Sequence, residues 1–179
     1  MTQAPIRFFF DTLASPIGEL LLATDDQGVL RALDFEDHEE RMRRLLRRQY
    51  RSEVILEAGP APETVTGPIR RYFAGDFDAL REVPWKTGGT AFQQSVWEGL
   101  TKIPSGQTLS YGALAGKLGA PKAMRAVGLA NGANPIALVA PCHRVIGANG
   151  SLTGFGGGLP RKRWLLEHEG AAFAEKAAA

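Results

Sequence analysis

The sequence changes its pattern at a turn-rich segment, residues 83–89, and this change most limits the folds that the chain can adopt. Before it, three short apolar runs between residues 7 and 35 are typical of strands, and an Asp-Asp-Gln-Gly turn joins the last two. After it, capping residues and apolar spacing predict a series of short helices. We therefore expect two domains, an α/β domain over residues 1–87 and a mostly α domain over residues 88–179.

In the first domain a helix is expected after Asp37, which forms a candidate capping box with Glu40. This helix carries five arginines: Arg41, Arg43, Arg44, Arg47 and Arg48. Such a run can contact nucleic acid, but a solvated helix face is the better explanation.

The second domain contains a candidate helix-turn-helix. Ser110 is expected to cap a helix over residues 111–118, and a third helix is expected to begin at Pro121 and to have Gly132 as its C-cap. Two short helices joined by a Gly-containing turn match this motif, but a helical hairpin in a core has the same pattern.

The third helix is unusual in having mostly small residues around Arg125. A helix that reads bases in the major groove projects several long polar side chains. A helix of small residues can instead approach a DNA backbone or minor groove and insert one long side chain, or it can simply pack closely against another helix. The net charge of residues 90–179 is +5, against −3 for residues 1–89, which suits an anionic partner.

The chain has one cysteine, Cys142, which His143 follows directly. A single cysteine cannot form an internal disulfide, which favours a reduced, cytoplasmic location. The apolar run over residues 136–140 is expected to be a buried strand that ends at this pair. A thiol beside an imidazole is a candidate nucleophile if the chain turns at Cys142, because neighbouring side chains in a strand face opposite ways. The alternative is a buried, unreactive thiol.

Two later segments can complete such a site. A helix that begins at Pro160 brings carboxylates, among them Glu169, and a base usually needs such a group to orient it. The Gly-rich loop over residues 147–158 offers backbone N–H groups to a planar ligand. The loop is not a phosphate-binding loop, because no Gly-Lys-Ser/Thr sequence follows it.

Together these segments resemble the O6-alkylguanine-DNA alkyltransferases, and most closely their constitutive bacterial members. The resemblance rests on Asn134-Pro135, Pro-Cys-His-Arg-Val at 141–145, Tyr111, Arg-Ala-Val-Gly at 125–128, the Gly-rich loop and Trp-Leu-Leu-Glu-His-Glu-Gly at 164–170. It is dense between residues 88 and 170 and weaker before them. It implies an α/β N-terminal domain that is RNase H-like and a C-terminal winged helix-turn-helix domain.

The resemblance also implies a role for each site residue. Cys142 would accept the alkyl group, His143 would take the thiol proton through a water, and Glu169 would orient His143. Asn134 would be a hinge, and Arg125 would replace the extruded base in the stack. The guanine pocket would comprise Tyr111, Val145, Phe155 and Gly156, and the DNA-binding surface would comprise Tyr111, Ala123, Arg125, Ala126 and Gly128.

The implied reaction is direct-reversal DNA repair. The protein would flip O6-alkylguanine out of double-stranded DNA and move the alkyl group irreversibly to Cys142, so that each molecule acts once. DNA would be bound through the minor groove without sequence specificity, by a monomer that can load in several copies. No membrane and no cofactor are expected. No structural metal is expected either, because the N-terminal part has no cysteine and only His38 where vertebrate relatives bind zinc.

Phe155 stands where the family often has Tyr, so a hydroxyl at that position is missing. Two other classes of function remain as alternatives. One is a lesion-recognition module that does not repair, which Cys142 argues against. The other is a Cys-His hydrolase of small amides or esters, which would turn over many times.

Overall fold

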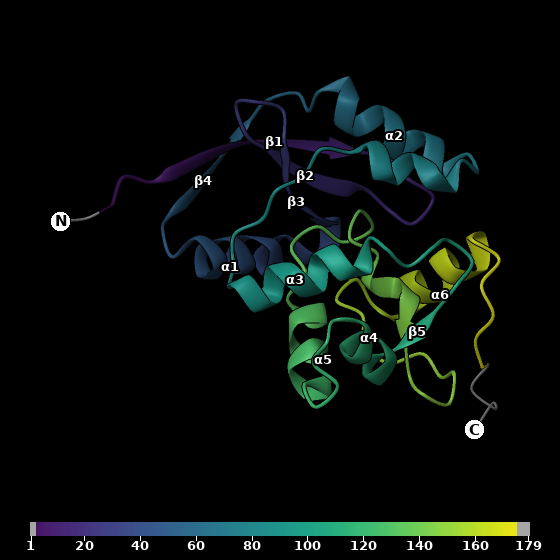
Figure 1. Cartoon of the computed structure of the whole chain (residues 1–179). Helices are drawn as coiled ribbons and strands as arrows, with labels where there is room; N and C mark the ends of the chain where they lie inside the picture. The colour runs from purple at the N-terminus through teal and green to yellow at the C-terminus, as the bar shows by residue number, and fades with distance from the viewer. Residues whose placement is uncertain (1–2, 175–179) are drawn as a thin grey trace. The chain divides into compact units, whose positions relative to one another are not determined.

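The computed structural model describes residues 3–174, which form two compact units (Figure 1). One unit comprises Met1–Thr90 with Pro135–Val139, and the other comprises Ala91–Asn134 with Ala140–Ala179. The first is a mixed α/β domain and the second is mainly helical. Among the described residues, no helix is long and apolar enough to cross a membrane.

The N-terminal unit is built on a four-stranded sheet in the order β3-β2-β1-β4. The strands are β1 (Ile6–Leu13), β2 (Leu20–Thr24), β3 (Leu30–Phe35) and β4 (Val54–Ala58). The first three are antiparallel neighbours and confirm the predicted strands, whereas β4 runs parallel to β1 and was not predicted. All five residues of β2 are buried, because the sheet is covered on both faces.

Helix α1 (Glu39–Tyr50) lies on one side of this sheet and α2 (Glu63–Phe73) on the other, with a 3-10 helix, η2 (Phe77–Glu82), after it (Figure 1). Met42 and Leu46 of α1 pack on Phe8 and Leu21 of the sheet. This burial stabilises the amphipathic helix more than its intrinsic propensity does.

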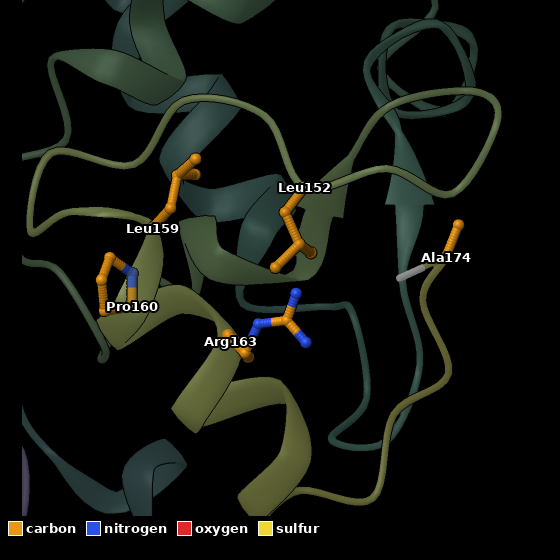
Figure 2. A pocket seen from close by; sticks show the side chains of 5 residues that line it. All are labelled: Leu152, Leu159, Pro160, Arg163 and Ala174. Carbon is orange, nitrogen blue, oxygen red and sulfur yellow. The ribbon is translucent and has the colours of Figure 1, made fainter. Parts of the chain in front are cut away.

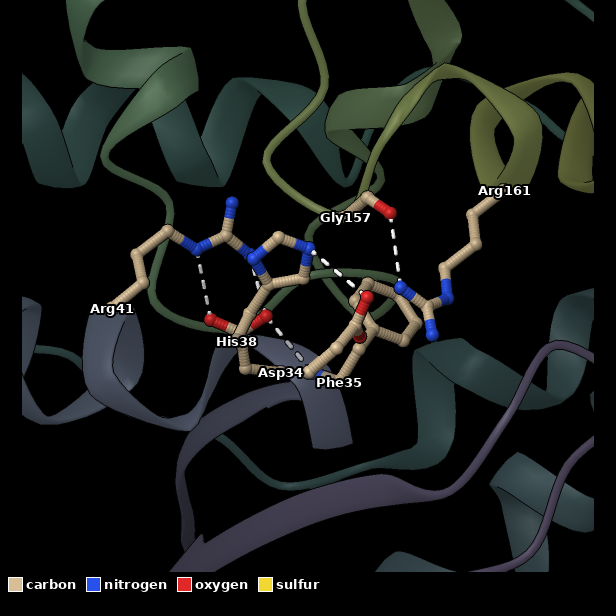
Figure 3. A network of polar contacts seen from close by, with 7 residues as sticks. Asp34, Phe35, His38, Arg41, Gly157 and Arg161 are labelled. Carbon is tan, nitrogen blue, oxygen red and sulfur yellow. Dashed lines mark hydrogen bonds and ion pairs between the residues drawn. The ribbon is translucent and has the colours of Figure 1, made fainter.

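The predicted capping box at the start of α1 is wrong. Residues Glu36–His38 form a short 3-10 helix, η1, and the N-cap position of α1 is His38, with no side-chain cap hydrogen bond. Arg41 of the arginine run is tied to the domain itself: it donates to both carboxylate oxygens of the buried Asp34, with 3.0 Å from Nε to Oδ2 (Figure 3).

The C-terminal unit contains α3 (Ala91–Leu100), α4 (Tyr111–Lys117), α5 (Met124–Gly132) and α6 (Leu159–His168). A two-stranded parallel sheet joins β5 (Leu109–Ser110) to β6 (Val145–Ile146). Ser110 caps α4 as predicted, since its hydroxyl accepts from the Ala113 N–H at 3.0 Å. The indole of Trp97 on α3 donates to the Ala130 carbonyl at 2.8 Å and anchors α5.

Two predictions in this part of the chain are wrong. Helix α5 begins at Met124 rather than Pro121, because a turn closed by the Ala123 N–H and the Ala120 carbonyl comes first. Gly132 is its last residue, and Ala133 is the C-cap.

The run over residues 136–140 is buried but is not a strand. Ile136 makes a single parallel bridge with Leu33, and Leu138 then adopts a positive φ of 74°, which ends the extended conformation.

Candidate functional site

The segment that delivers Cys142 is held by one side chain. The chain leaves the C-terminal unit after Asn134 and returns at Ala140. The Asn134 side-chain amide donates to the Ala140 carbonyl at 2.7 Å and so joins these two points. Residues Cys142–Arg144 then form a 3-10 turn, η3. The chain therefore turns at Cys142, which the nucleophile hypothesis required.

Behind Cys142 lies a fully buried group of three charged or titratable side chains. His143 Nε2 and Glu169 Oε2 are 2.8 Å apart. Arg144 grips the same carboxylate with two bonds, 2.8 Å to Oε1 and 2.9 Å to Oε2, and donates to the Ile103 carbonyl at 2.7 Å. The predicted partnership of His143 with Glu169 is thus present, and Arg144 is a third member that sequence reasoning missed.

The electrostatics of this group leave His143 neutral at neutral pH. Burial lowers the pKa of His143 below its ordinary value, and the nearby Arg144 and Lys162 act in the same direction against Glu169. Burial alone would raise the pKa of Glu169, but His143 and the hydrogen bonds from His143 and Arg144 outweigh it and lower that pKa. Neutral His143 then donates from Nε2 to Glu169, and the buried Nδ1, which has no partner among the described residues, keeps a lone pair that can accept a proton.

A fully buried lysine fixes the loop beside Cys142. Lys162 of α6 donates from Nζ to the carbonyls of Val145 and Thr153, each at 2.6 Å. Burial lowers the pKa of Lys162 to about 8, and the Coulombic interaction with Cys142 opposes this shift. Lys162 therefore holds the strand after Cys142 against the Gly-rich loop and places a positive charge near the thiol.

Replacing Lys162 with methionine is expected to slow the reaction of Cys142 with iodoacetamide at neutral pH by about tenfold. The thiolate is the reactive form, and it would lose a neighbouring positive charge. Intact mass spectrometry over time at several pH values measures the rate. Arg163→Met is the matched control, since Arg163 follows on the same helix and is partly exposed. Equal slowing in both variants would show that only net charge matters.

The thiol opens onto a pocket of about 240 Å³ within the C-terminal unit. Its lining residues are Tyr111, Gly128, Asn131, Gly132, Cys142, Gly154, Phe155 and Gly156. Of the predicted pocket residues, Tyr111, Phe155 and Gly156 line it. Val145 is fully buried outside this lining, and its carbonyl accepts from Lys162. Tyr111 Oη lies 3.1 Å from Thr153 Oγ1, a hydrogen bond that orients the phenol.

The Gly-rich loop is held at its other end as well. The Gly158 N–H donates to the Phe155 carbonyl at 2.9 Å, and Arg161 donates to the Gly157 carbonyl at 3.1 Å (Figure 3). Hydrogen bonds therefore hold the loop on both sides of Phe155, from Lys162 to the Thr153 carbonyl before it and from Arg161 to the Gly157 carbonyl after it.

The predicted DNA-binding residues gather at the start of α5. Arg125 and Ala126 are exposed, Ala123 is half-buried, and Gly128 lines the pocket. The exposed surface of α5 thus has one long cationic side chain, Arg125, together with the small Ala126 and two large apolar side chains, Met124 and Leu129.

A second pocket of about 320 Å³ in the same unit is lined by Leu152, Leu159, Pro160, Arg163 and Ala174 (Figure 2). Its apolar side chains surround one guanidinium, and none of these five residues is a nucleophile or a carboxylate. This second pocket therefore offers no group of the kind that Cys142 supplies to the first.

Sequence reasoning missed three residues of this site: Asn131, Arg144 and Lys162. Arg144 and Asn131 adjoin recognised positions, but nothing in the local sequence indicates burial of a lysine in the Arg-Lys-Arg run of α6.

Two family models match the chain almost end to end. Residues 9–86 match the ribonuclease-like domain of 6-O-methylguanine DNA methyltransferase, and residues 91–171 match the DNA-binding domain of the same family.

Individual relatives agree with these matches. The methylated-DNA–protein-cysteine methyltransferase of Shigella flexneri is 48% identical over 166 residues, which are 92% of this chain and 97% of that protein. The protein of the same name from Mycobacterium tuberculosis strain H37Rv is 47% identical over 89% of this chain and 91% of its own length. The crystal structure of Mycobacterium tuberculosis OGT in complex with DNA has a TM-score of 0.74 and 43% identity, and covers 92% of this chain and 93% of that one.

Proposed function

This chain belongs to the 6-O-methylguanine DNA methyltransferase family and repairs alkylated DNA by moving the alkyl group to a cysteine, and we propose that Cys142 is the acceptor. Its activity is that of a methylated-DNA–protein-cysteine methyltransferase. The observation that carries the proposal is the position of the chain's single cysteine at the wall of a base-sized pocket, with the buried His143–Glu169 pair behind it.

In the proposed reaction, His143 draws the proton from the Cys142 thiol. The free lone pair of His143 Nδ1 supports transfer through one water, while Glu169 orients the ring. The thiolate sulfur then attacks the alkyl carbon, an S–C bond forms and the C–O6 bond breaks. Tyr111, at the pocket wall, protonates the departing guanine.

Each molecule acts once in this scheme. The product is a thioether, and none of the groups described around the pocket activates a water to cleave a carbon–sulfur bond. The alkyl group therefore stays on Cys142.

DNA binding is proposed to use the surface of α5. O6 of a stacked guanine is out of reach of a buried thiol, so the base must be extruded into the pocket. Arg125 takes its place in the stack, while Ala123, Ala126 and Gly128 approach the backbone and Tyr111 crowds the phosphate. The small exposed side chains support binding in the minor groove without sequence specificity.

The finer description of the two domains is also part of the proposal. A sheet with α1 and α2 on opposite faces supports an RNase H-like N-terminal domain, and α4, α5 and the β5-β6 pair support a winged helix-turn-helix. Asn134, whose amide bonds the returning chain, is proposed as the hinge. We also infer a monomer that can load in several copies along DNA, and a cytoplasmic location.

The test is the intact mass of the protein after incubation with duplex DNA that contains one O6-methylguanine. We expect a gain of one methylene unit, located to the peptide that bears Cys142, in at most one copy per chain. Tight binding of the lesion without a gain would instead indicate a recognition module. Neither binding nor gain, together with repeated turnover of small esters or amides, would indicate a hydrolase.

A further inference from the structure

A row of exposed arginines on the N-terminal unit has no task in the site described above. It comprises Arg44, Arg47 and Arg48 of α1, and Arg51 at the C-cap position ends it. Residues three and four apart lie on the same side of a helix, so these side chains share one face. At 1.5 Å of rise per residue, the row extends over about 10 Å. We call it the α1 stripe.

The arginines of the α1 stripe are not neutralised by the protein. None of them forms an ion pair with any residue between positions 3 and 174. Most other arginines of the same unit are paired with a carboxylate; they are Arg7, Arg31, Arg41, Arg43, Arg70 and Arg71. The fold thus compensates the guanidinium groups around the α1 stripe and leaves the stripe itself available to an anionic partner.

The rest of the unit does not share this positive charge. The net charge of residues 1–89 is −3, so a general attraction for anions does not account for the stripe. The helix dipole accounts for part of it, because cations in the last turn of a helix are stabilising and Arg47 and Arg48 lie there. This effect falls off within one turn, and Arg44 lies before that turn.

The geometry of the stripe suits the phosphates of DNA. Phosphates of one strand follow each other at about 3.4 Å along the axis of the duplex, so a row of about 10 Å spans about three of them. Guanidinium groups bind phosphate oxygens with two parallel hydrogen bonds and read no base. The family to which the chain belongs binds DNA through a domain that matches residues 91–171, and α1 lies outside that range.

We propose that the α1 stripe is a second DNA-binding surface, on the N-terminal unit, whose guanidinium groups contact phosphates of double-stranded DNA. The inference rests on the proposed function, which supplies DNA as the partner. It extends that function by giving the N-terminal unit a share in the affinity for DNA. Contacts to phosphates alone add affinity on any sequence, which suits a protein that must bind wherever a lesion occurs.

The experiment measures how salt weakens the binding of a fluorescently labelled, undamaged duplex to the full chain. Anisotropy titrations between about 50 and 200 mM salt give the slope of log K against log salt concentration. Each phosphate contact contributes about 0.9 to this slope. The triple variant Arg44→Gln, Arg47→Gln and Arg48→Gln is therefore expected to have a slope shallower by about 2.7 than that of the natural protein.

Two further triple variants separate phosphate contacts from net charge and from helix stability. The first removes three exposed positive charges elsewhere in the same unit and should leave the slope unchanged; it combines Arg70→Gln, Arg81→Gln and Lys86→Gln. The second keeps the charge of the stripe and should restore the natural slope, because lysine also binds phosphate; it combines Arg44→Lys, Arg47→Lys and Arg48→Lys.

An unchanged slope in the glutamine variant of the stripe would overturn the proposal and leave the α1 stripe as a solvated helix face. Equal shallowing in the control variant would also overturn it, because net charge alone would then explain the effect. Neither result bears on alkyl transfer, which is measured separately as the mass gain from O6-methylguanine. Conversely, a natural protein that gains no mass would contradict the proposed function, whatever the slopes are.

Discussion

Replacement of Cys142 by alanine is expected to abolish alkyl transfer completely while the protein still binds lesion-containing DNA. The chain has no second cysteine that could take over as acceptor. The side chain is small and 5% exposed, so alanine removes the sulfur with little change in the pocket wall. Intact mass spectrometry measures the transfer, and fluorescence anisotropy with a labelled duplex measures the binding.

Cys142→Ser is the matched control for this loss. Serine keeps the size of the side chain, but its hydroxyl is a far weaker nucleophile than a thiolate. We expect binding like that of the natural protein and no detectable mass gain. A mass gain in either variant would show that another residue accepts the alkyl group and would overturn the assignment of Cys142.

Replacement of Glu169 by glutamine is expected to reduce both stability and rate strongly. Arg144 would lose the carboxylate that accepts two of its three hydrogen bonds, and a buried charge without its partner is costly. We expect the free energy of unfolding to fall by about 3 kcal/mol. We expect alkyl transfer to slow by about 100-fold, because His143 would lose the group that orients it. Urea denaturation and single-turnover kinetics measure the two effects.

Glu167→Gln provides the control, since Glu167 lies two residues away on α6 with its side chain 56% exposed. Its ion pair with Arg163 is at the surface, and we expect a loss below about 0.5 kcal/mol. A similar loss in the two variants would contradict the structural importance of the buried cluster.

The same cluster predicts how stability depends on pH. The pKa of His143 is lowered from 6.5 in the folded state, so the unfolded chain binds more protons as the pH falls below 6.5, and stability declines. The pKa of Glu169 is also lowered in the folded state, from 4.5. Its contribution to the free energy of unfolding is therefore present above pH 4.5 and is lost as the pH falls further. Unfolding free energies measured between pH 8 and pH 3 should therefore fall throughout, and Glu169→Gln should lack the part below pH 4.5.

Local sequence patterns were sufficient for much of the fold. The first three strands and the helix capped by Ser110 follow from alternation and capping, which act within a few residues. Strand β4 was missed, because it is short and half-exposed and is fixed by parallel pairing with β1, whose residues lie about 50 positions earlier. The run over residues 136–140 was mistaken for a strand, because its buried character comes from tertiary packing rather than from a ladder.

For the site, the sequence by itself determined the chemistry: one cysteine, an adjacent histidine and a family pattern that relates them to Glu169, Tyr111 and Arg125. The tertiary structure decided which neighbours tune that chemistry. Arg144 and Lys162 are charged residues of kinds that are usually solvated, and Asn131 is a common helix-end residue. Arg144 and Lys162 gain their hydrogen-bond partners because they are buried, and burial leaves the side-chain oxygen of Asn131 without one. The burial of these residues depends on segments that are distant in sequence. A pattern read along the chain records which groups are present, whereas their desolvation, and hence their pKa values and hydrogen bonds, arises when the chain folds.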